Sequence, residues 1–302
     1  MSTQSLKVDS ENSQLRLDVY LARTLPDGPS RTFVKELIDT GQVSVNHRRV
    51  KAHYKVCLQD LITVNIPEEV FDQDKVKPEH IPLKVFFEDE DLLVINKAAG
   101  MLVHPAKGCY TGTLVNALLY HCQNLSDFNT AFRPGIVHRL DRETSGLMVI
   151  AKNNKTHANL ARQFEKRLVK KRYIALVEGL VEFEEGLVDA SLGRHPRYRD
   201  RKAVAFDDEA RKAKTFYRVI KRLDKATFVA LLPRTGRTHQ LRVHMAYLGH
   251  PILGDDKYGK KNSFSRLALH AQSIGFFHPS TTKFVEFSCP PPAEFLQFGS
   301  SH

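Results

Sequence analysis

The chain has 302 residues, of which 42% are hydrophobic and 26% charged, so it can bury a sizeable core and its length favours two domains. Its apolar runs are far too short to span a bilayer, and residues 1–5 lack the core of a signal peptide, so we expect a soluble, cytoplasmic protein without a membrane partner. The four cysteines show no C-x-x-C spacing, which argues against a disulfide framework and a zinc knuckle. The formal charge of +11 favours a polyanionic partner, because neutralisation of phosphates by Lys and Arg dominates nucleic-acid affinity.

The N-terminal part of the chain predicts a disordered stretch followed by a small domain. Residues 1–14 are polar and patternless, and we expect them to be disordered. The first folded unit is predicted over residues 15–66, with a second helix that begins after Ser30 as its N-cap and ends at Gly41. Apolar side chains at helical spacing predict its first helix: Leu17, Leu21 and Leu25. Short strands follow up to residue 66, so we predict an α+β domain whose basic face either tracks a phosphate backbone or is simply solvated.

Residues 67–82 are rich in proline and charge and show no apolar periodicity, which predicts the linker between the domains. The second domain is predicted over residues 83–302. Its first two strands, near 83–87 and 92–96, form a hairpin, and strands and single helices then alternate without a strict βαβ rhythm. This pattern predicts an α+β fold with a mixed, largely antiparallel sheet and flanking helices.

The most informative stretch is residues 135–146, Gly-Ile-Val-His-Arg-Leu-Asp-Arg-Glu-Thr-Ser-Gly, which precedes the apolar run 147–151. Asp141 lies between two arginines where a loop enters a predicted buried strand, and loops anchored in this way commonly carry chemistry. In an extended segment Arg139 shares a face with Asp141, while His138 takes the other. We interpret Asp141 as the catalytic residue of an RNA-modifying enzyme; the alternative is a surface ion pair beside a turn.

A second candidate element is a helix in residues 236–249, with Thr238 as its N-cap and Gly249 as its end. Its apolar stripe is predicted from side chains at helical spacing: Leu241, Met245 and Leu248. Arg242 lies near the start of this helix, beside the stripe, and is able to point into the domain. Because a buried arginine needs a carboxylate, we expect an acidic partner there.

A metal site is not predicted. His239 and His244 are five residues apart, which places them about 140° around a helix and argues against a shared zinc ion. The zinc deaminase signature of H-x-E with P-C-x-x-C is also absent. Two basic stretches, 162–172 and 194–214, are either solvated faces or candidates for an RNA cleft.

Three ordered motifs resemble the RluA family of pseudouridine synthases: 138–146, 171–176 (Lys-Arg-Tyr-Ile-Ala-Leu), and 236–244 together with 249–255. The N-terminal unit resembles the S4 RNA-binding domain through residues 16–18, the helix with Arg31 and Lys35, and residues 41–46 followed by Arg48. With this front end, the chain is most similar to the RluD type, which modifies large-subunit ribosomal RNA. One departure is Ala98, where the family commonly has proline.

The resemblance implies a role for each motif residue. Asp141 would be the catalytic aspartate, Arg242 its ion-pair partner, and Tyr173 the ring stacked on the target base, while Arg139 would help to replace the flipped nucleotide. The candidate substrate-binding residues are Arg139, His138, Arg31, Lys35 and Arg48. Isomerising uridine to pseudouridine oxidises nothing and consumes no water, so no cofactor and no metal are expected.

We therefore predict a monomeric isomerase that converts uridine to pseudouridine in structured RNA, with 23S ribosomal RNA or the pre-ribosomal large subunit as its partner. Whether Asp141 acts as a nucleophile or as a proton acceptor at the ribose stays open. Three alternatives remain: a non-catalytic S4-type RNA-binding protein of ribosome assembly, a pseudouridine synthase acting on transfer RNA, and a metal-dependent hydrolase of nucleic acid.

Overall fold

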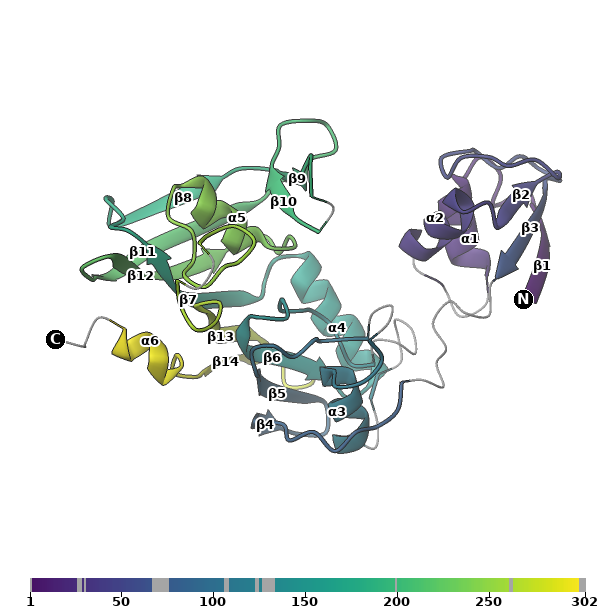
Figure 1. The fold of residues 1–302 in the computed structure, drawn as a ribbon. Helices are drawn as coiled ribbons and strands as arrows, with labels where there is room; N and C mark the ends of the chain where they lie inside the picture. The colour runs from purple at the N-terminus through teal and green to yellow at the C-terminus, as the bar shows by residue number, and fades with distance from the viewer. Residues whose placement is uncertain are drawn as a thin grey trace. The chain divides into compact units, whose positions relative to one another are not determined.

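The computed structural model describes residues 2–25, 29, 31–66, 76–105, 109–122, 125–126, 134–198, 200–260 and 263–298. The chain divides into two compact units (Figure 1). The main division falls between Lys77 and Pro78, inside the predicted linker, and among the later described residues Cys109 and Tyr110 are grouped with the smaller unit. Residues 67–75 of that linker lie outside the described residues. At its other end, the Glu79 N–H donates to the carbonyl of Asn116 at 3.0 Å, which binds this end to the larger unit.

The smaller unit pairs two helices with a three-stranded antiparallel sheet in the order β1, β3, β2. The helices are α1 (Leu17–Thr24) and α2 (Arg31–Asp39), and the strands are β1 (Ser2–Lys7), β2 (Val43–Val45) and β3 (Leu61–Ile66). The helices contact each other, and α2 also contacts the sheet. Buried apolar side chains from both layers form its core, among them Leu17, Leu21, Val34, Leu37, Ile62 and Val64.

The prediction of a disordered N-terminus is wrong for residues 2–7. These residues form β1, which pairs with β3 from Ser2 opposite Ile66 to Lys7 opposite Leu61, and Val8 behind it is buried. Backbone hydrogen bonds hold an edge strand without an apolar pattern in its side chains, so a polar sequence concealed it. Gly41 follows α2 with a φ of +77°, as its predicted role as the helix end requires, whereas Ser30 lies outside the described residues.

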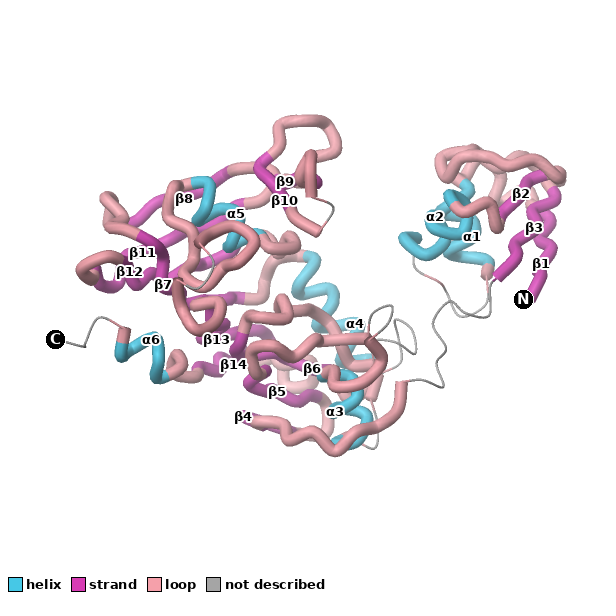
Figure 2. Tube along the Cα trace, viewed as in Figure 1, coloured by secondary structure: helices cyan, strands magenta, loops and turns pink. Residues whose placement is uncertain are grey.

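In the larger unit, nine described strands form one sheet (Figure 2). Their order is β4, β5, β6, β13, β7, β12, β11, β8, and β14 pairs with β13. The pairing of β6 with β13 is parallel and the other described pairings in this sheet are antiparallel, which confirms the predicted fold class. The bounds are β4 (Val85–Glu88), β5 (Leu92–Lys97), β6 (Ser145–Ala151), β7 (Lys170–Glu178), β8 (Glu185–Asp189), β11 (Lys214–Arg222), β12 (Ala226–Pro233), β13 (Leu269–Phe277) and β14 (Phe284–Ser288).

Local hydrogen bonds explain the predicted hairpin of β4 and β5. The Asp89 carboxylate accepts hydrogen bonds from the backbone N–H groups of Asp91 and Leu92 at 2.9 and 2.8 Å, which closes the acidic turn between β4 and β5.

All seven residues of β6 are buried, as expected for a strand in the interior of a sheet that is covered on both faces. A separate hairpin joins β9 (Leu192–Arg194) and β10 (Lys202–Val204).

The remaining helices are α3 (Leu114–His121), α4 (Asn154–Glu165), α5 (Gln240–Tyr247) and α6 (Ala293–Gln297). Helix α4 packs on β6 and β13 through the buried Leu160. Leu168, at helical spacing after Leu160, does not continue the buried stripe, because it is 47% exposed. Arg167 adopts a φ of +58° and the Leu168 N–H returns to the carbonyl of Gln163, so the chain has already left the helix.

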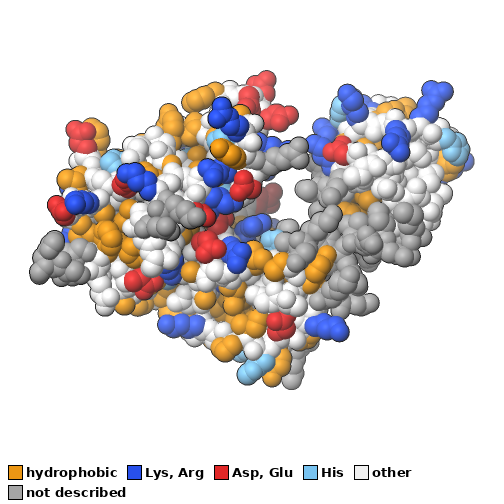
Figure 3. All heavy atoms as spheres, viewed as in Figure 1, with side chains coloured by type: hydrophobic (Ala, Val, Ile, Leu, Met, Phe, Trp, Pro, Cys, Tyr) orange, Lys and Arg blue, Asp and Glu red, His pale blue; other side chains and the backbone are white. Residues whose placement is uncertain are grey.

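None of the helices in the described ranges is long and apolar enough to cross a membrane. Figure 3 shows Lys and Arg side chains on the visible surface of both units. On the face of the smaller unit that is in view they outnumber Asp and Glu.

Candidate active site

Asp141 lies at the end of a loop that leads into the fully buried strand β6. The carbonyl of Asp141 accepts a hydrogen bond from the N–H of Thr144 at 3.1 Å, which closes a turn, and Ser145 then begins the strand. The side chain of Asp141 is 19% exposed, so its carboxylate reaches solvent from a mostly enclosed position. The predicted placement of this residue, on a loop anchored by a buried strand, is confirmed.

Gly146 allows β6 to approach β13 closely. Its φ is +121°, and a Cβ placed there would lie 2.3 Å from the carbonyl oxygen of Ala271. Ser145 and Gly146 pair with His270 and Ala271 in the parallel ladder. A side chain at position 146 would therefore push apart the two strands that anchor the Asp141 turn.

Lys97 holds the same turn from the other side. It is 1% exposed, and its ammonium donates to the carbonyls of Ala98, Met101 and Arg142 at 2.7, 2.9 and 3.0 Å. Burial lowers the pKa of Lys97 to about 8, with nearby Arg266 acting in the same direction and the Glu143 and Asp141 carboxylates opposing. Ala98, where the family commonly has proline, thus has its carbonyl fixed by the preceding lysine.

Arg242 is buried and lies between two carboxylates. It donates from Nε and Nη2 to both oxygens of Asp255, each at 2.7 Å, and its Nη1 lies 3.7 Å from Oδ2 of Asp141. The predicted approach of Arg242 to Asp141 is therefore present at ion-pair distance, but its hydrogen-bonded partner is Asp255. Burial acts to lower the pKa of Arg242, but the hydrogen bonds and charge of Asp255, with a contribution from Asp141, outweigh it and raise this pKa.

The start of α5 differs from the prediction. The helix begins at Gln240, and its N-cap is His239 with a φ of +58° rather than Thr238. The side chain of Gln240 accepts from the Arg237 N–H at 3.0 Å and from the Thr235 hydroxyl at 2.7 Å, so it closes the loop that a capping threonine was expected to close. This geometry brings the His239 side chain within 4.0 Å of Asp141, measured from Nε2 to Oδ2.

A cavity of about 1020 Å³ in the larger unit contains all three predicted catalytic residues: Asp141, Tyr173 and Arg242. Tyr173 comes from β7, where it pairs with Leu231 of β12 and Ala271 of β13, so its ring position is set by the middle of the sheet. Burial, and then the charge of Asp141, raise the pKa of its hydroxyl well above the ordinary value. A neutral phenol ring beside a carboxylate offers a flat surface on which a base can stack.

The lining of the cavity is strongly basic. Arginine and lysine side chains outnumber its two acids, Asp141 and Glu165, and comprise Arg139, Arg167, Lys170, Lys171, Arg234, Arg237 and Arg242. The basic stretch 162–172 contributes three of them, which fits its predicted place in the cleft. The stretch 194–214 contributes no lining residue, so that part of the prediction does not apply to this cavity.

His138 and Arg139 diverge, as expected for neighbours in an extended segment. Arg139 is exposed and lines the cavity, whereas the His138 ring packs at 4.7 Å against the ring of Phe164, and its Nε2 accepts from the Val149 N–H at 3.1 Å. Burial, helped by Lys171, lowers the pKa of His138 to about 3, so this ring stays neutral. These contacts favour a role in fixing the loop over the predicted substrate contact.

The predicted RNA-binding residues of the smaller unit are on its surface where the structure describes them. Lys35 on α2 and Arg48 after β2 are exposed, and the side chain of Arg31 lies outside the described residues. Asn46 and His47, with φ of +48° and +62°, form the polar turn that presents Arg48.

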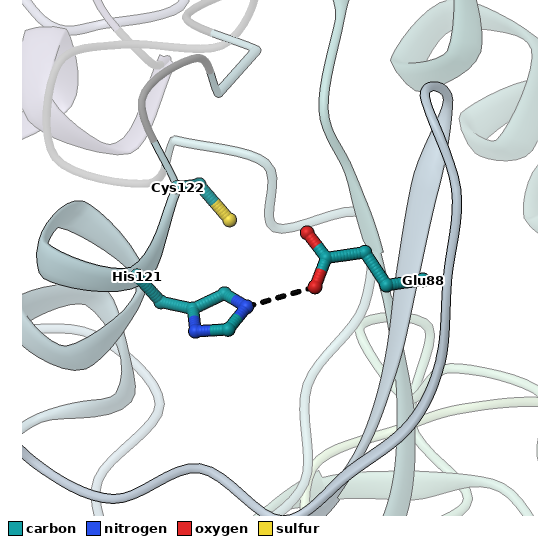
Figure 4. Close-up of side chains that lie close together, drawn as sticks. All are labelled: Glu88, His121 and Cys122. Atoms are coloured by element: carbon teal, nitrogen blue, oxygen red, sulfur yellow. Dashed lines mark hydrogen bonds and ion pairs between the residues drawn. The ribbon is translucent and has the colours of Figure 1, made fainter.

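One group of described residues has the atoms to hold a metal ion: Glu88, His121 and Cys122, whose ligand atoms lie within 4.8 Å of one another (Figure 4). The Glu88 carboxylate already accepts from His121 at 2.8 Å and from the Lys152 ammonium at 3.0 Å. Burial raises the pKa of the Cys122 thiol to about 11. The carboxylate of this group is thus already bound by a histidine and a lysine, and its thiol is held in the protonated form.

Comparison with known proteins identifies the class to which this fold and site belong. Residues 91–247, which include Asp141, Tyr173 and Arg242, match the family model of RNA pseudouridylate synthases, and residues 15–62 match the S4 domain. The chain belongs to the RNA pseudouridylate synthase family, whose members isomerise uridine to pseudouridine in RNA. The predicted enzyme class and the S4-like front end are thereby confirmed.

The similarity to individual relatives extends over nearly the full chain. An uncharacterised RNA pseudouridine synthase of Bacillus subtilis is 43% identical, over 98% of this chain and 97% of its own. Ribosomal large subunit pseudouridine synthase D of Zymomonas mobilis is 42% identical, over 97% of this chain and 96% of its own. Among solved structures, human RNA pseudouridylate synthase domain containing 1 matches with a TM-score of 0.58 and 28% identity, over 70% of this chain and 84% of its own.

Two residues of the site, Asp255 and His239, are not predicted from the sequence. Asp255 ends the motif 249–255, but nothing in the sequence tied it to Arg242 thirteen residues earlier. From the sequence, His239 is weighed only as a metal ligand, although its position in the same motif as Arg242 could have indicated a place in the site. Asp255 lies beyond the residues that match the family model, so the site extends past that range.

Proposed function

We propose that this chain isomerises uridines of 23S ribosomal RNA in the large subunit, with Asp141 as the catalytic residue. The observation that carries the proposal is the position of the Asp141 carboxylate in the basic cavity, with the buried Arg242 3.7 Å away and Tyr173 in the same lining. Asp141 faces a cation, Arg242, whereas glycosidases pair two carboxylates to activate water.

The chemistry follows from these positions. A flipped uridine enters the cavity, its base stacks on Tyr173, and its ribose C1′ meets Asp141, because a base within a stack hides both atoms that must react. The N1–C1′ bond breaks, the uracil turns, and C5 bonds to C1′. Either route for Asp141, as nucleophile or as proton acceptor, requires the ionised carboxylate, and the Arg242 guanidinium lies 3.7 Å from it.

Arg242 is held in turn by Asp255, which accepts two hydrogen bonds from the Nε and Nη2 edge of the guanidinium and so fixes the direction of Nη1. Arg139, exposed at the cavity, would fill the space that the flipped nucleotide leaves. The basic lining would bind the flanking phosphates without reading their sequence.

The proposed target rests on the relatives and on the smaller unit. The Zymomonas mobilis relative, similar over nearly its full length, carries the name of a ribosomal large subunit enzyme. We propose that residues 15–66 bind ribosomal RNA through a face that includes Lys35 and Arg48, and that residues 83–302 perform the chemistry. We propose that the chain acts as a monomer in the cytoplasm, where ribosomal RNA is found.

The chemical proposal is tested by Asp141→Asn, which keeps the shape of the side chain but can neither bond to C1′ nor accept a proton. We expect pseudouridine formation to fall by about 10⁴-fold while RNA affinity changes by severalfold at most. The matched control is Asp256→Asn, because Asp256 lies 4.0 Å from the same Arg242 but is 69% exposed. Turnover by a verified Asp141→Asn protein near that of the control would refute the assignment.

The target is tested by mapping pseudouridines across total RNA from cells with and without the gene. We expect the lost sites to lie in 23S ribosomal RNA. Loss confined to transfer RNA would contradict the target and leave the chemistry intact. Loss at no site would contradict both.

A further inference from the structure

We propose that His239 is a further catalytic residue, which donates its Nε2–H to a carbonyl oxygen of the flipped uracil. This inference rests on the proposed role of Asp141. His239 lines the same cavity as Asp141, Tyr173 and Arg242, and its side chain is 14% exposed. Asp141, Tyr173 and Arg242 already have proposed roles, and none of these roles involves His239.

The hydrogen bonds around the ring determine which nitrogen carries the proton. Nδ1 of His239 lies 2.8 Å from the hydroxyl of Tyr258, and that hydroxyl oxygen also accepts the backbone N–H of Lys202 at 2.8 Å. The Tyr258 proton is then free to be donated to Nδ1, which places the proton of the neutral imidazole on Nε2. In the opposite tautomer the hydroxyl would accept twice, and its own proton would have no acceptor among the described residues.

The ring is also kept neutral. Burial lowers the pKa of His239, and the charges of Arg242 and Lys257 act in the same direction, while Asp141 and Asp255 oppose them. A neutral imidazole with a fixed tautomer is a hydrogen-bond donor that does not neutralise the adjacent carboxylate. It can therefore donate a hydrogen bond to the substrate without taking the negative charge of the Asp141 carboxylate.

The donor faces the place where the substrate must lie. Nε2 is 4.0 Å from Oδ2 of Asp141, beyond hydrogen-bond distance, and no hydrogen bond from Nε2 is found within the described part of the chain. Arg242 Nη1 approaches the same oxygen at 3.7 Å. His239 Nε2 and Arg242 Nη1 thus lie on either side of the Asp141 carboxylate without a hydrogen bond to it. The N–H of His239 is therefore available to a ligand in the cavity.

The acceptor follows from the electron count of the reaction. When N1–C1′ breaks, its electron pair stays with the uracil, which becomes an anion whose charge spreads over N1 and the two carbonyl oxygens. C5 then bonds to C1′ and passes its proton to the Asp141 carboxylate or to water, and N1 takes a proton from solvent, so the proton count balances without a transfer from His239. A fixed N–H donor binds the anion more strongly than the neutral base and so stabilises the detached state.

The protein holds this donor rigidly. His239 adopts a left-handed backbone conformation, which is rare for a residue with a side chain and is found chiefly where the surroundings impose it. The Gln240 side chain fixes the adjoining loop, and the Tyr258 ring meets the His239 ring edge-on at 5.6 Å. Such fixed orientation is what a donor needs in order to act without reorganising during the reaction.

The test compares two amides in the full-length protein. In His239→Gln the amide nitrogen can reach the position of Nε2, whereas the shorter side chain of His239→Asn reaches only that of Nδ1 and tolerates the left-handed backbone better. Each is assayed for single-turnover pseudouridine formation on total RNA from cells that lack the gene, for RNA affinity, and for thermal unfolding.

We expect His239→Asn to lower the single-turnover rate by about 10²-fold with little change in RNA affinity or stability, and His239→Gln to recover most of that loss. A rate for His239→Asn equal to that of the wild type overturns the inference. A loss in His239→Gln as large as that in His239→Asn, or larger, overturns it too, because a donor at the position of Nε2 would then restore nothing. Asp141→Asn runs in parallel: if it is active, the proposed function fails, and if it alone is inactive, only the role of His239 fails.

Discussion

Removing the guanidinium of Arg242 should separate its structural role from its catalytic one. In Arg242→Met, the carboxylate of Asp255 loses both of its 2.7 Å hydrogen bonds while its side chain remains fully buried, at 0% exposure. An unpaired buried charge of this kind costs about 3–5 kcal/mol. For a unit of this size that corresponds to a fall in melting temperature of roughly 6–20 °C.

The double variant Arg242→Met with Asp255→Asn then removes the unpaired charge, and the new side-chain oxygen can still accept from the N–H groups of Lys257 and Tyr258. We expect the free energy of unfolding, measured in urea, to recover by several kcal/mol, while pseudouridine formation stays low because Asp141 still lacks its cation. The control Arg218→Met breaks an exposed pair with Glu185 and should cost less than about 1 kcal/mol. A stable single variant, or full activity in the double variant, would refute this reasoning.

Three further predictions follow from the structure. Tyr173→Phe should keep most activity because the stacking face remains, whereas Tyr173→Leu should weaken RNA binding by about 1–3 kcal/mol, measured by titration; equal behaviour would return Tyr173 to an ordinary strand residue. Because burial lowers the pKa of His270 to about 4, its neutral form stabilises the folded protein fully above pH 6.5, and that contribution of roughly 3 kcal/mol should disappear between pH 6.5 and 4. Urea titrations of His270→Gln should show a flatter dependence over that range. Deletion of residues 1–75 should leave a folded enzyme that modifies short RNA but is slower and less selective on ribosomal RNA; an insoluble product would mean that the units depend on each other.

Much of the larger unit could be predicted from the sequence because its local signals agree with its final packing. The run 147–151 is uniformly apolar and becomes a strand buried along its whole length, and the acidic turn before Leu92 contains the Asp89 side chain that closes it. The placement of Asp141 followed from the same logic, since a turn had to lie between the charged loop and this strand.

The parts that could not be predicted have partners distant in sequence, or have a side chain that takes the capping role expected of another residue. Residues 2–7 become a strand only because residues 61–66 offer free backbone groups, and their own sequence gives no sign of this. Thr238 has the right chemistry for a cap, but the Gln240 amide closes the loop first. Asp255 takes the hydrogen bonds of Arg242 because the chain returns after α5, a path that no spacing rule specifies.

The last long strand of the sheet has a consequence for how the enzyme is made. β13 is the only described strand between β6, which anchors Asp141, and β7, which carries Tyr173. A ribosome-bound chain that has not yet extruded residues 269–277 holds two partial sheets with no strand between them, and the two halves of the site have nothing to set their spacing. Catalytic competence is therefore acquired only after residues 269–277 have been made, by a pairing of long sequence separation that is expected to form late. A truncated product released before that point would retain the S4 domain and lack the completed site.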